Sequence, residues 1–188
     1  MEEKYYPWGG DFTEGNPKSS VAIVLLNIKY KPSEDVAIYG NLKTENIGVE
    51  KIVANVISNP NIRFLIIIGE EIRGHKSGRS LICLNKNGID DKNKIIDAPG
   101  AIPYVENLDN KAINRFQNQI EIVDLIDVTD KKQIDEKVDD LLNKKINPLS
   151  KPYIAIKIKQ EKTEITDKRA LHSKITIDYI GNVKKRGK

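Results

Sequence analysis

The residues best suited to chemistry lie in the glycine-rich segment 69–80, which contains two adjacent carboxylates, Glu70 and Glu71, and an imidazole, His75. The segment directly follows the apolar run 62–68, which predicts a buried strand, and ligands of open α/β sheets bind where strands end. An imidazole can ligate a transition metal or transfer a proton near neutral pH, and a carboxylate can act as a base. His75 is therefore a candidate ligand, with an exposed histidine that has no role as the alternative interpretation.

Three loops are predicted to meet at one edge of the sheet, because the carboxyl ends of parallel strands lie together. They span residues 43–46, 70–78 and 99–103. Glycines in the second and third loops allow the backbone to approach a large ligand closely. The predicted helix starts at Asn46 and near Ser77 offer N–H groups to an amide, carboxylate or phosphate oxygen. This edge is the predicted binding site.

Hydrophobic periodicity predicts the elements that position these loops. Runs rich in Val and Ile predict strands at residues 21–26, 36–39, 62–68 and 120–128. Apolar residues at helical spacing predict helices at residues 49–57, 80–86, 112–120 and 134–142. Asn46, Asp109 and Asp130 are the expected N-caps, and residues 1–20 are expected to be irregular, with aromatic anchors. The alternation of strands and helices predicts an α/β fold with a Rossmann-like, mostly parallel sheet and helices on both faces.

A change in pattern and charge divides the chain into a predicted α/β domain at residues 1–150 and a basic β extension at residues 151–188. The first part carries 20 Lys and Arg against 23 Asp and Glu, whereas the extension carries 11 against 4. Alternating apolar residues predict two antiparallel strands in the extension, at 153–159 and 175–179. Its charge could bind RNA, an acidic protein or an anionic membrane surface, or form a solvated face. Few aromatic residues accompany the lysines, which argues against nucleic acid.

Composition excludes several other classes of protein. With 39% hydrophobic and 31% charged residues the chain is typical of a globular protein. Its apolar runs are far shorter than the roughly 20 residues of a membrane span. A single cysteine, Cys83, and an N-terminus without a signal peptide favour the cytoplasm. The chain contains neither a P-loop nor a Gly-x-Gly-x-x-Gly motif, and one Cys with two His argues against structural zinc.

Several segments have the character of family motifs, and the longest is YPWGGDFTEGNP at residues 6–17. The others lie at residues 42–48, 57–64, 69–80 and 100–103. Together they resemble the corrinoid-carrying A subunit of tetrahydromethanopterin S-methyltransferase from methanogenic archaea. The similarity spans about residues 5–145, and the segments occur in the same order, which makes the resemblance far more specific than a single glycine motif.

The resemblance implies a methyltransferase subunit that binds a cobamide, the cobalt corrinoid related to vitamin B12. In the family, cobalt takes a methyl group from methyl-tetrahydromethanopterin and passes it to coenzyme M, and the whole complex couples this transfer to sodium export. The histidine that matches His75 is regarded as the lower axial ligand of cobalt. A partner that fixes its tautomer is expected, and Glu70 or Glu71 is the nearest candidate by sequence. The implied partners are the corrinoid and the other methyltransferase subunits.

The resemblance also implies that the cofactor-binding residues lie in the three converging loops. They are Thr44, Glu45, Asn46, Gly69, Glu70, Gly74, His75, Gly78, Ser80, Gly100, Ala101, Ile102 and Pro103. The membrane-bound family member ends in a hydrophobic anchor helix, which this sequence does not contain, and this difference favours a soluble homologue. The alternative functions are a corrinoid storage or delivery protein and a non-catalytic binding module that uses the basic extension.

Overall fold

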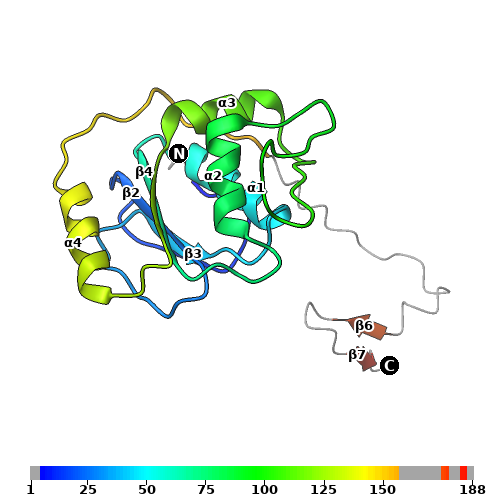
Figure 1. Ribbon diagram of the computed structural model, residues 1–188, viewed down its shortest axis with the longest axis horizontal. Coiled ribbons are helices and arrows are strands. Elements are labelled where there is room, and N and C mark those ends of the chain that lie inside the picture. The colour runs from blue at the N-terminus through cyan, green and yellow to red at the C-terminus, as the bar shows by residue number, and fades with distance from the viewer. Residues whose placement is uncertain (1–4, 157–174, 178–182, 186–188) are drawn as a thin grey trace. The chain divides into compact units, whose positions relative to one another are not determined.

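A five-stranded β-sheet forms the core of the first of two structural units, residues 1–158 (Figure 1). The computed structural model describes residues 5–156, 175–177 and 183–185. The strands of the sheet are β1 (Phe12–Glu14), β2 (Val21–Leu25), β3 (Ile38–Asn41), β4 (Phe64–Gly69) and β5 (Glu121–Ile126). The helices are α1 (Ile47–Ser58), α2 (Ser77–Asn87), α3 (Asn110–Gln119) and α4 (Lys131–Leu142). The strand order is β1-β3-β2-β4-β5 and only β1 is antiparallel, which confirms the predicted α/β fold.

Helices cover both faces of the sheet, as predicted, with α4 on one side and α1, α2 and α3 on the other (Figure 1). Although β2 is buried throughout, its side chains alternate between the two faces. Ala22 and Val24 pack in the cluster that contains α1, α2 and α3 residues, whereas Val21, Ile23 and Leu25 pack in the cluster with α4. Each Val, Leu or Ile side chain buried in this way contributes roughly 1.5–3 kcal/mol. The continuous apolar runs in the sequence therefore reflect burial on both faces.

The predicted N-caps are confirmed. The side chains of Asn46, Asp109 and Asp130 each accept a backbone N–H in the first turn of the helix that follows. Asn46 and Thr44 accept the N–H groups of the first two residues of α1, at 2.8 and 3.0 Å. The expectation that these N–H groups are free for a ligand is therefore wrong, because local side chains already satisfy them.

The strand order creates a topological switch point between β2 and β4. From β2 the chain reaches β3 on one side through residues 26–37, whose Ile28, Tyr30 and Val36 pack on the α4 face. It then passes through α1 on the opposite face and enters β4 on the other side of β2. Ligands of open α/β sheets bind in the crevice outside the carboxyl ends of the strands at such a point. The loops that follow β2 and β4 are therefore the place to look for a site.

The N-terminal segment is more regular than predicted. Residues 12–14 form β1, which pairs with β3 in antiparallel fashion, so the expectation of an irregular segment is wrong here. A three-residue strand is too short to show a period-two pattern, and the free edge of β3 decides its pairing. The expected aromatic anchoring is present, because Tyr6 is buried and its ring lies edge-on to that of Phe12 at 6.2 Å.

The start of the predicted basic extension belongs to the first unit. Residues 152–156 form no strand, and the N–H of Tyr153 donates to the carbonyl of Ile57 at 3.2 Å. The strand predicted at 153–159 is therefore wrong in its described part, because this stretch packs on the main core, and 157–159 lie outside the described residues. The second predicted strand is present as β6 (Ile175–Ile177), which pairs with β7 (Val183–Lys185). The rest of the extension, with His172, lies outside the described residues.

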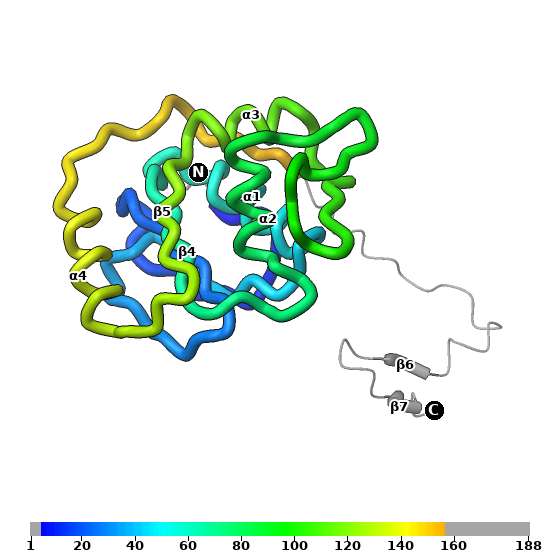
Figure 2. The backbone as a smooth tube through the Cα atoms, in the orientation of Figure 1, coloured from blue at the N-terminus to red at the C-terminus, as the bar shows by residue number. Residues whose placement is uncertain are grey.

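The segment that follows α4 runs from α4 toward α3 (Figure 2), and two arginines hold it. Arg63 donates to the carbonyl of Asn147 at 2.9 Å, and Arg115 donates to those of Leu149 and Lys151 at 2.6 and 3.0 Å. Burial, with a smaller contribution from the charge of Arg63, lowers the pKa of Arg115. Arg63 lies directly before β4, at the end of the sheet opposite the carboxyl edge, and Arg115 lies in the second half of α3, which leads to the same end. The segment that they hold passes from the α4 face of the sheet back to the face covered by α1 and α3.

Candidate functional site

A cavity of about 950 Å³ lies at the switch point. It is lined by the loop after β2, the end of β3 and the loop after β4, including Gly74 and Lys76, the residues on either side of His75. Its volume lies near the upper end of the range for small-molecule sites, about 300–1,000 Å³. The cavity therefore suits a large ligand.

The cavity is rich in positive charge. Its cationic side chains are those of Lys29, Lys43, Arg73 and Lys76. Two carboxylates, those of Glu70 and Glu71, line the same cavity, and Glu71 is already bonded to backbone N–H groups. The balance favours a ligand that carries negative charge or many oxygen acceptors.

Glu45 connects the three predicted loops. Its carboxylate is buried, with 2% of the side chain exposed, whereas the His75 side chain is 51% exposed. Glu45 Oε2 lies 2.8 Å from His75 Nδ1, and Oε1 accepts the N–H of Ile102 at 2.8 Å. The expectation that Glu70 or Glu71 is the partner of His75 is therefore wrong, because the chain passes through α1 and β4 before it brings His75 back against Glu45.

The surroundings of Glu45 stabilise its ionised carboxylate. Burial opposes ionisation, but hydrogen bonds from its own backbone N–H and from Ile102, together with the contact to His75, outweigh it and lower the pKa of Glu45 below its ordinary value. An ionised carboxylate accepts hydrogen bonds and donates none, so His75 Nδ1 carries the proton in this contact. The second ring nitrogen, Nε2, is then the one that can bind a metal or another ligand.

Gly100 allows the three loops to touch. A Cβ atom at this position would lie 2.6 Å from Glu45 Cγ and 2.6 Å from the backbone oxygen of His75. Since no side chain fits in this space, glycine is required for the close approach. The predicted convergence of the three loops is confirmed by this contact and by the two hydrogen bonds of Glu45.

A second buried carboxylate secures the third loop. Glu50, 1% exposed, accepts the N–H of Asn107 at 2.9 Å, the side-chain amide of Asn107 at 2.6 Å and the N–H of Glu106. Its position in the first turn of α1 also suits the positive end of the helix dipole. Glu45 and Glu50 thus attach the irregular segment before α3 to the start of α1.

Glu71 braces the loop that carries His75. Its carboxylate accepts the N–H groups of Gly78 and Arg79 at 3.3 and 2.6 Å, which caps the start of α2. Between these contacts, Gly74 and Lys76 adopt left-handed backbone conformations, with φ of 86° and 43°. The cap fixes both ends of a tight turn with His75 at its tip. The start of α2 at Ser77 confirms the helix start predicted near that residue, and the helix begins one turn before the predicted apolar pattern at 80–86.

Removal of this cap is expected to loosen the His75 loop. Glu71→Ala should lower the free energy of unfolding by about 1–2 kcal/mol, the usual effect of losing an N-terminal cap. Hydrogen exchange at the amides of Gly78 and Arg79 should rise in the same variant. Glu70→Ala is the matched control, because Glu70 is exposed and adjacent in sequence. Equal effects of the two substitutions would show that the hydrogen bonds of Glu71 are not what fixes the loop.

Only two of the predicted site residues, Glu70 and Gly74, line the cavity. The others, His75 and Glu45 among them, lie outside its lining, and several of these position the surrounding elements. Ser80 is buried in α2, and its hydroxyl donates to the carbonyl of Lys76 at 3.0 Å. A Cβ atom on Gly78 would lie 2.8 Å from Leu26, and one on Gly69 would lie 2.7 Å from Ile28. These residues allow close packing of α2 and of the loop after β2. Pro103 contributes its carbonyl to the N–H of Ile95, while Ala101 and Ile102 are exposed.

The sequence reasoning missed the loop after β2. Asn27 and Lys29 line the cavity, and the N–H of Asn27 donates to the carbonyl of Glu70 at 3.1 Å. The sequence does show that this loop follows a predicted strand, the apolar run 21–26. That position indicates a binding site only once β2 is known to border the switch point.

Within the described residues, no group of three or more His, Cys, Asp and Glu side chains could hold a metal ion. A metal ion bound by His75 would therefore have a single protein ligand within the described residues. The same part of the chain contains no helix with the length and apolar character needed to cross a membrane.

Comparison with known proteins identifies the family. Residues 2–166 match the family described as the A subunit of tetrahydromethanopterin S-methyltransferase. The chain is 48% identical over 155 residues to A subunit 1 of this methyltransferase from Methanothermobacter thermautotrophicus, covering 80% of this chain and 65% of that protein. It is 45% identical over 157 residues to A subunit 2 from Methanobrevibacter ruminantium, covering 81% of each chain.

A third relative is also similar in sequence over most of its length. A subunit 2 from Methanothermobacter marburgensis is 46% identical over 134 residues, which cover 69% of this chain and 72% of that protein. The family match includes all five strands of the sheet and the loops at its carboxyl edge. The chain therefore belongs to the family of A subunits of tetrahydromethanopterin S-methyltransferase.

Proposed function

We propose that this chain is the cobamide-binding subunit of a methyltransferase and carries a methyl group from methyl-tetrahydromethanopterin to coenzyme M or a related acceptor. The observation that carries the proposal is the half-exposed His75, whose Nδ1 is held by the buried Glu45 at 2.8 Å beside a large cavity. Membership of a methyltransferase subunit family supports the transferase role. The named donor and acceptor require partner subunits that this chain does not include.

The residues at the carboxyl edge fit a cobamide. A single imidazole supplies one ligand, which suits a metal that brings its other ligands in a macrocycle. The cavity of about 950 Å³ suits a large cofactor, and its four cationic side chains suit the phosphate and amide oxygens of a cobamide. When bound, a cobamide supplies a cobalt centre that accepts and releases a methyl group.

The chain's own residues would orient and tune this ligand. The Glu45 carboxylate accepts a hydrogen bond from the protonated Nδ1 of His75 and so leaves the lone pair on Nε2, which a metal requires. Glu71 keeps the His75 loop in its tight turn, and Gly100 allows that loop to lie against Glu45. The half-exposed position of His75 leaves its outer edge open to a cofactor. This division of labour is usual, since the cofactor carries the chemistry and the protein provides orientation.

Electron paramagnetic resonance of the cobalt(II) cobamide tests the assignment directly. Protein labelled with ¹⁵N-histidine is titrated with the cofactor, and the splitting of the cobalt signal by its axial nitrogen is recorded. A doublet is expected, because ¹⁵N from His75 replaces ¹⁴N as the axial ligand, and His75→Ala should abolish it. His172→Ala, which removes the other histidine of the chain, is the matched control.

Two other outcomes would contradict the proposal in different ways. A triplet in the labelled protein would mean that the cobamide keeps its own base on the metal, so His75 would not be the ligand. Absence of binding by the wild-type protein would reject the cobamide. Tight binding without methyl transfer in the presence of partner subunits, donor and acceptor would favour storage or delivery of the corrinoid.

A further inference from the structure

The loop after β2 forms one wall of the large cavity and also reaches the opposite side of the sheet. Asn27, Ile28 and Lys29 line the cavity, whereas the next residue, Tyr30, packs in the hydrophobic cluster that contains α4. Neighbouring Cα atoms are about 3.8 Å apart, so the position of Tyr30 restricts where Lys29 can lie. A contact of Tyr30 therefore acts on the wall of the cavity.

Backbone contacts hold only the start of this loop. The N–H of Asn27 donates to the carbonyl of Glu70 at 3.1 Å. Gly69 lies against the next residue, because a Cβ atom on this glycine would be 2.7 Å from Ile28 Cβ. In the described part of the chain, residues 29–32 form no backbone hydrogen bond to one another or to other segments. The part of the loop that carries Lys29 thus depends on side chains for its position.

The hydroxyl of Tyr30 supplies this contact. It donates to Asp135 Oδ1 at 2.7 Å, across 105 residues of sequence. Burial, together with this hydrogen bond, raises the pKa of Tyr30, so the hydroxyl keeps its proton and remains a donor. A hydrogen bond to a carboxylate is roughly twice as strong as one between neutral groups.

Asp135 stands on a firmly anchored helix. Ile134 and Val138 of α4 are 0% and 2% exposed, and they pack in one cluster with side chains of β2 and β4. Asp130 caps the first turn of the same helix. Asp135 therefore gives the loop after β2 a fixed point on the α4 face.

We propose that Tyr30 and Asp135 are positioning residues, which hold the loop after β2 as a wall of the cavity and keep Lys29 directed to the ligand. This inference rests on the proposed function, in which the ligand is a cobamide. Neither Tyr30 nor Asp135 lines the cavity, so both act through the loop. Without their hydrogen bond the loop is ordered only when the ligand binds, and this ordering reduces the affinity.

The cobalamin affinity of full-length variants, measured by visible absorption, tests the proposal. Tyr30→Phe removes only the hydroxyl, and Asp135→Ala removes the acceptor. We expect each to weaken binding by roughly three- to tenfold, the effect of one or two side chains that must be ordered on binding. The double variant should bind no more weakly than either single variant, because both changes remove the same contact.

A conservative variant separates positioning from a general effect on the fold. Asp135→Asn keeps an oxygen that accepts the same hydrogen bond, so it should retain most of the affinity. Equal losses in Asp135→Asn and Asp135→Ala would show that the charge of Asp135 acts instead of the hydrogen bond. Lower stability with unchanged affinity would show a purely structural role, and either result would overturn the proposal.

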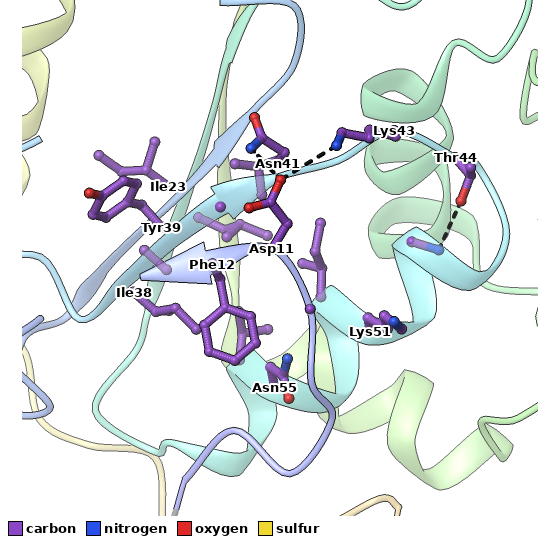
Figure 3. A pocket seen from close by; sticks show the side chains of 18 of the residues that line it. Asp11, Phe12, Ile23, Ile38, Tyr39, Asn41, Lys43, Thr44, Lys51 and Asn55 are labelled. Carbon is purple, nitrogen blue, oxygen red and sulfur yellow. Dashed lines mark hydrogen bonds and ion pairs between the residues drawn. The ribbon is translucent and has the colours of Figure 1, made fainter. Parts of the chain in front are cut away.

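Tyr39→Phe is the matched control. Tyr39 is half-buried in the same hydrophobic cluster as Tyr30 and pairs in register with Ile23 of β2. Figure 3, which shows a smaller pocket between β3 and α1, places its ring beside Ile23, and no hydrogen bond joins its hydroxyl to the other residues drawn there. The substitution should leave cobalamin affinity unchanged. A loss equal to that of Tyr30→Phe would refute a specific role for the Tyr30 hydroxyl.

Hydrogen exchange without cofactor distinguishes this inference from the proposed function. The amide of Asn27 should exchange faster in Tyr30→Phe than in the wild type, whereas the amide of Val138 in α4 should not change. If the wild type does not bind cobalamin, the cobamide is rejected, and faster exchange at Asn27 still supports the positioning of the loop. Unchanged exchange at Asn27 would overturn the positioning role even if cobalamin binds to His75.

Discussion

Glu45→Gln is expected to reduce cobamide affinity by roughly 10- to 100-fold, which is typical when the partner of a metal-ligating histidine is lost. Glutamine matches glutamate in size, and its carbonyl can still accept the N–H of Ile102, which Glu45 Oε1 now accepts at 2.8 Å. Its NH₂ group then faces His75 Nδ1, where the carboxylate oxygen stands at 2.8 Å. A donor at this place favours an unprotonated Nδ1 and moves the ring proton to Nε2, the nitrogen that the metal needs.

The tautomer can be measured without cofactor. Long-range ¹H–¹⁵N spectra of the histidine ring should show the proton on Nδ1 in the wild type and on Nε2 in Glu45→Gln. Glu106→Gln is a suitable control, because Glu106 is an exposed glutamate of the segment before α3 and approaches α1 only through its backbone. Unchanged ring spectra in Glu45→Gln would show that Glu45 does not set the tautomer.

The same substitution has a defined effect on the pH dependence of stability. The folded protein lowers the pKa of Glu45 below its ordinary value of 4.5, chiefly because hydrogen bonds to the carboxylate outweigh its burial. The stabilisation is therefore complete above the unfolded-state pKa and is lost as the pH falls through the folded-state pKa. Glu45→Gln should accordingly lose less stability than the wild type when the pH is lowered below about 4.5.

Gln119→Leu is expected to cause a large loss of stability, about 2–4 kcal/mol, without affecting the candidate site. The amide nitrogen of Gln119 lies 3.1, 2.8 and 3.1 Å from the carbonyl oxygens of Val56, Asn59 and Ile62. The side chain is 1% exposed, so its two N–H groups are shared among buried acceptors at the end of α1. Leucine fills a similar volume but leaves these oxygens unpaired, and each unpaired buried group costs roughly 1–3 kcal/mol.

Urea unfolding of the intact protein provides the measurement. Gln117→Leu is the matched control, because Gln117 lies on the same helix and is only half-buried. Arg115 Nε would also lose its acceptor, Gln119 Oε1 at 2.7 Å, so the segment after α4 should become more sensitive to protease. A loss no greater than that of Gln117→Leu would refute the bridging role. Cobamide affinity should be unchanged, since these contacts lie at the opposite end of the sheet from His75.

Local interactions account for what was predictable. Asn46, Asp109 and Asp130 were identified as N-caps because the group that each satisfies lies one to three residues further along the chain. The four helices follow from the periodicity of their apolar residues and the parallel strands from continuous apolar runs, and both signals are local. The short strand β1 was missed because three residues show no period. The strand predicted at 153–159 was wrong in its described part, residues 153–156, because side chains of that part pack on the main core.

The loops that form the candidate site were predicted, but the contacts that join these loops were not. The sequence by itself determined the α/β class, the caps and the three loops that supply the site, since each depends on neighbouring residues. Only the tertiary structure decided that Glu45, 30 residues before His75 and 57 before Ile102, joins the three loops. Such a contact depends on the strand order β3-β2-β4, which sets how far apart the loops after β3 and β4 lie, and on the segment between α2 and α3, which folds back against Glu45. No period or spacing along the chain encodes that order.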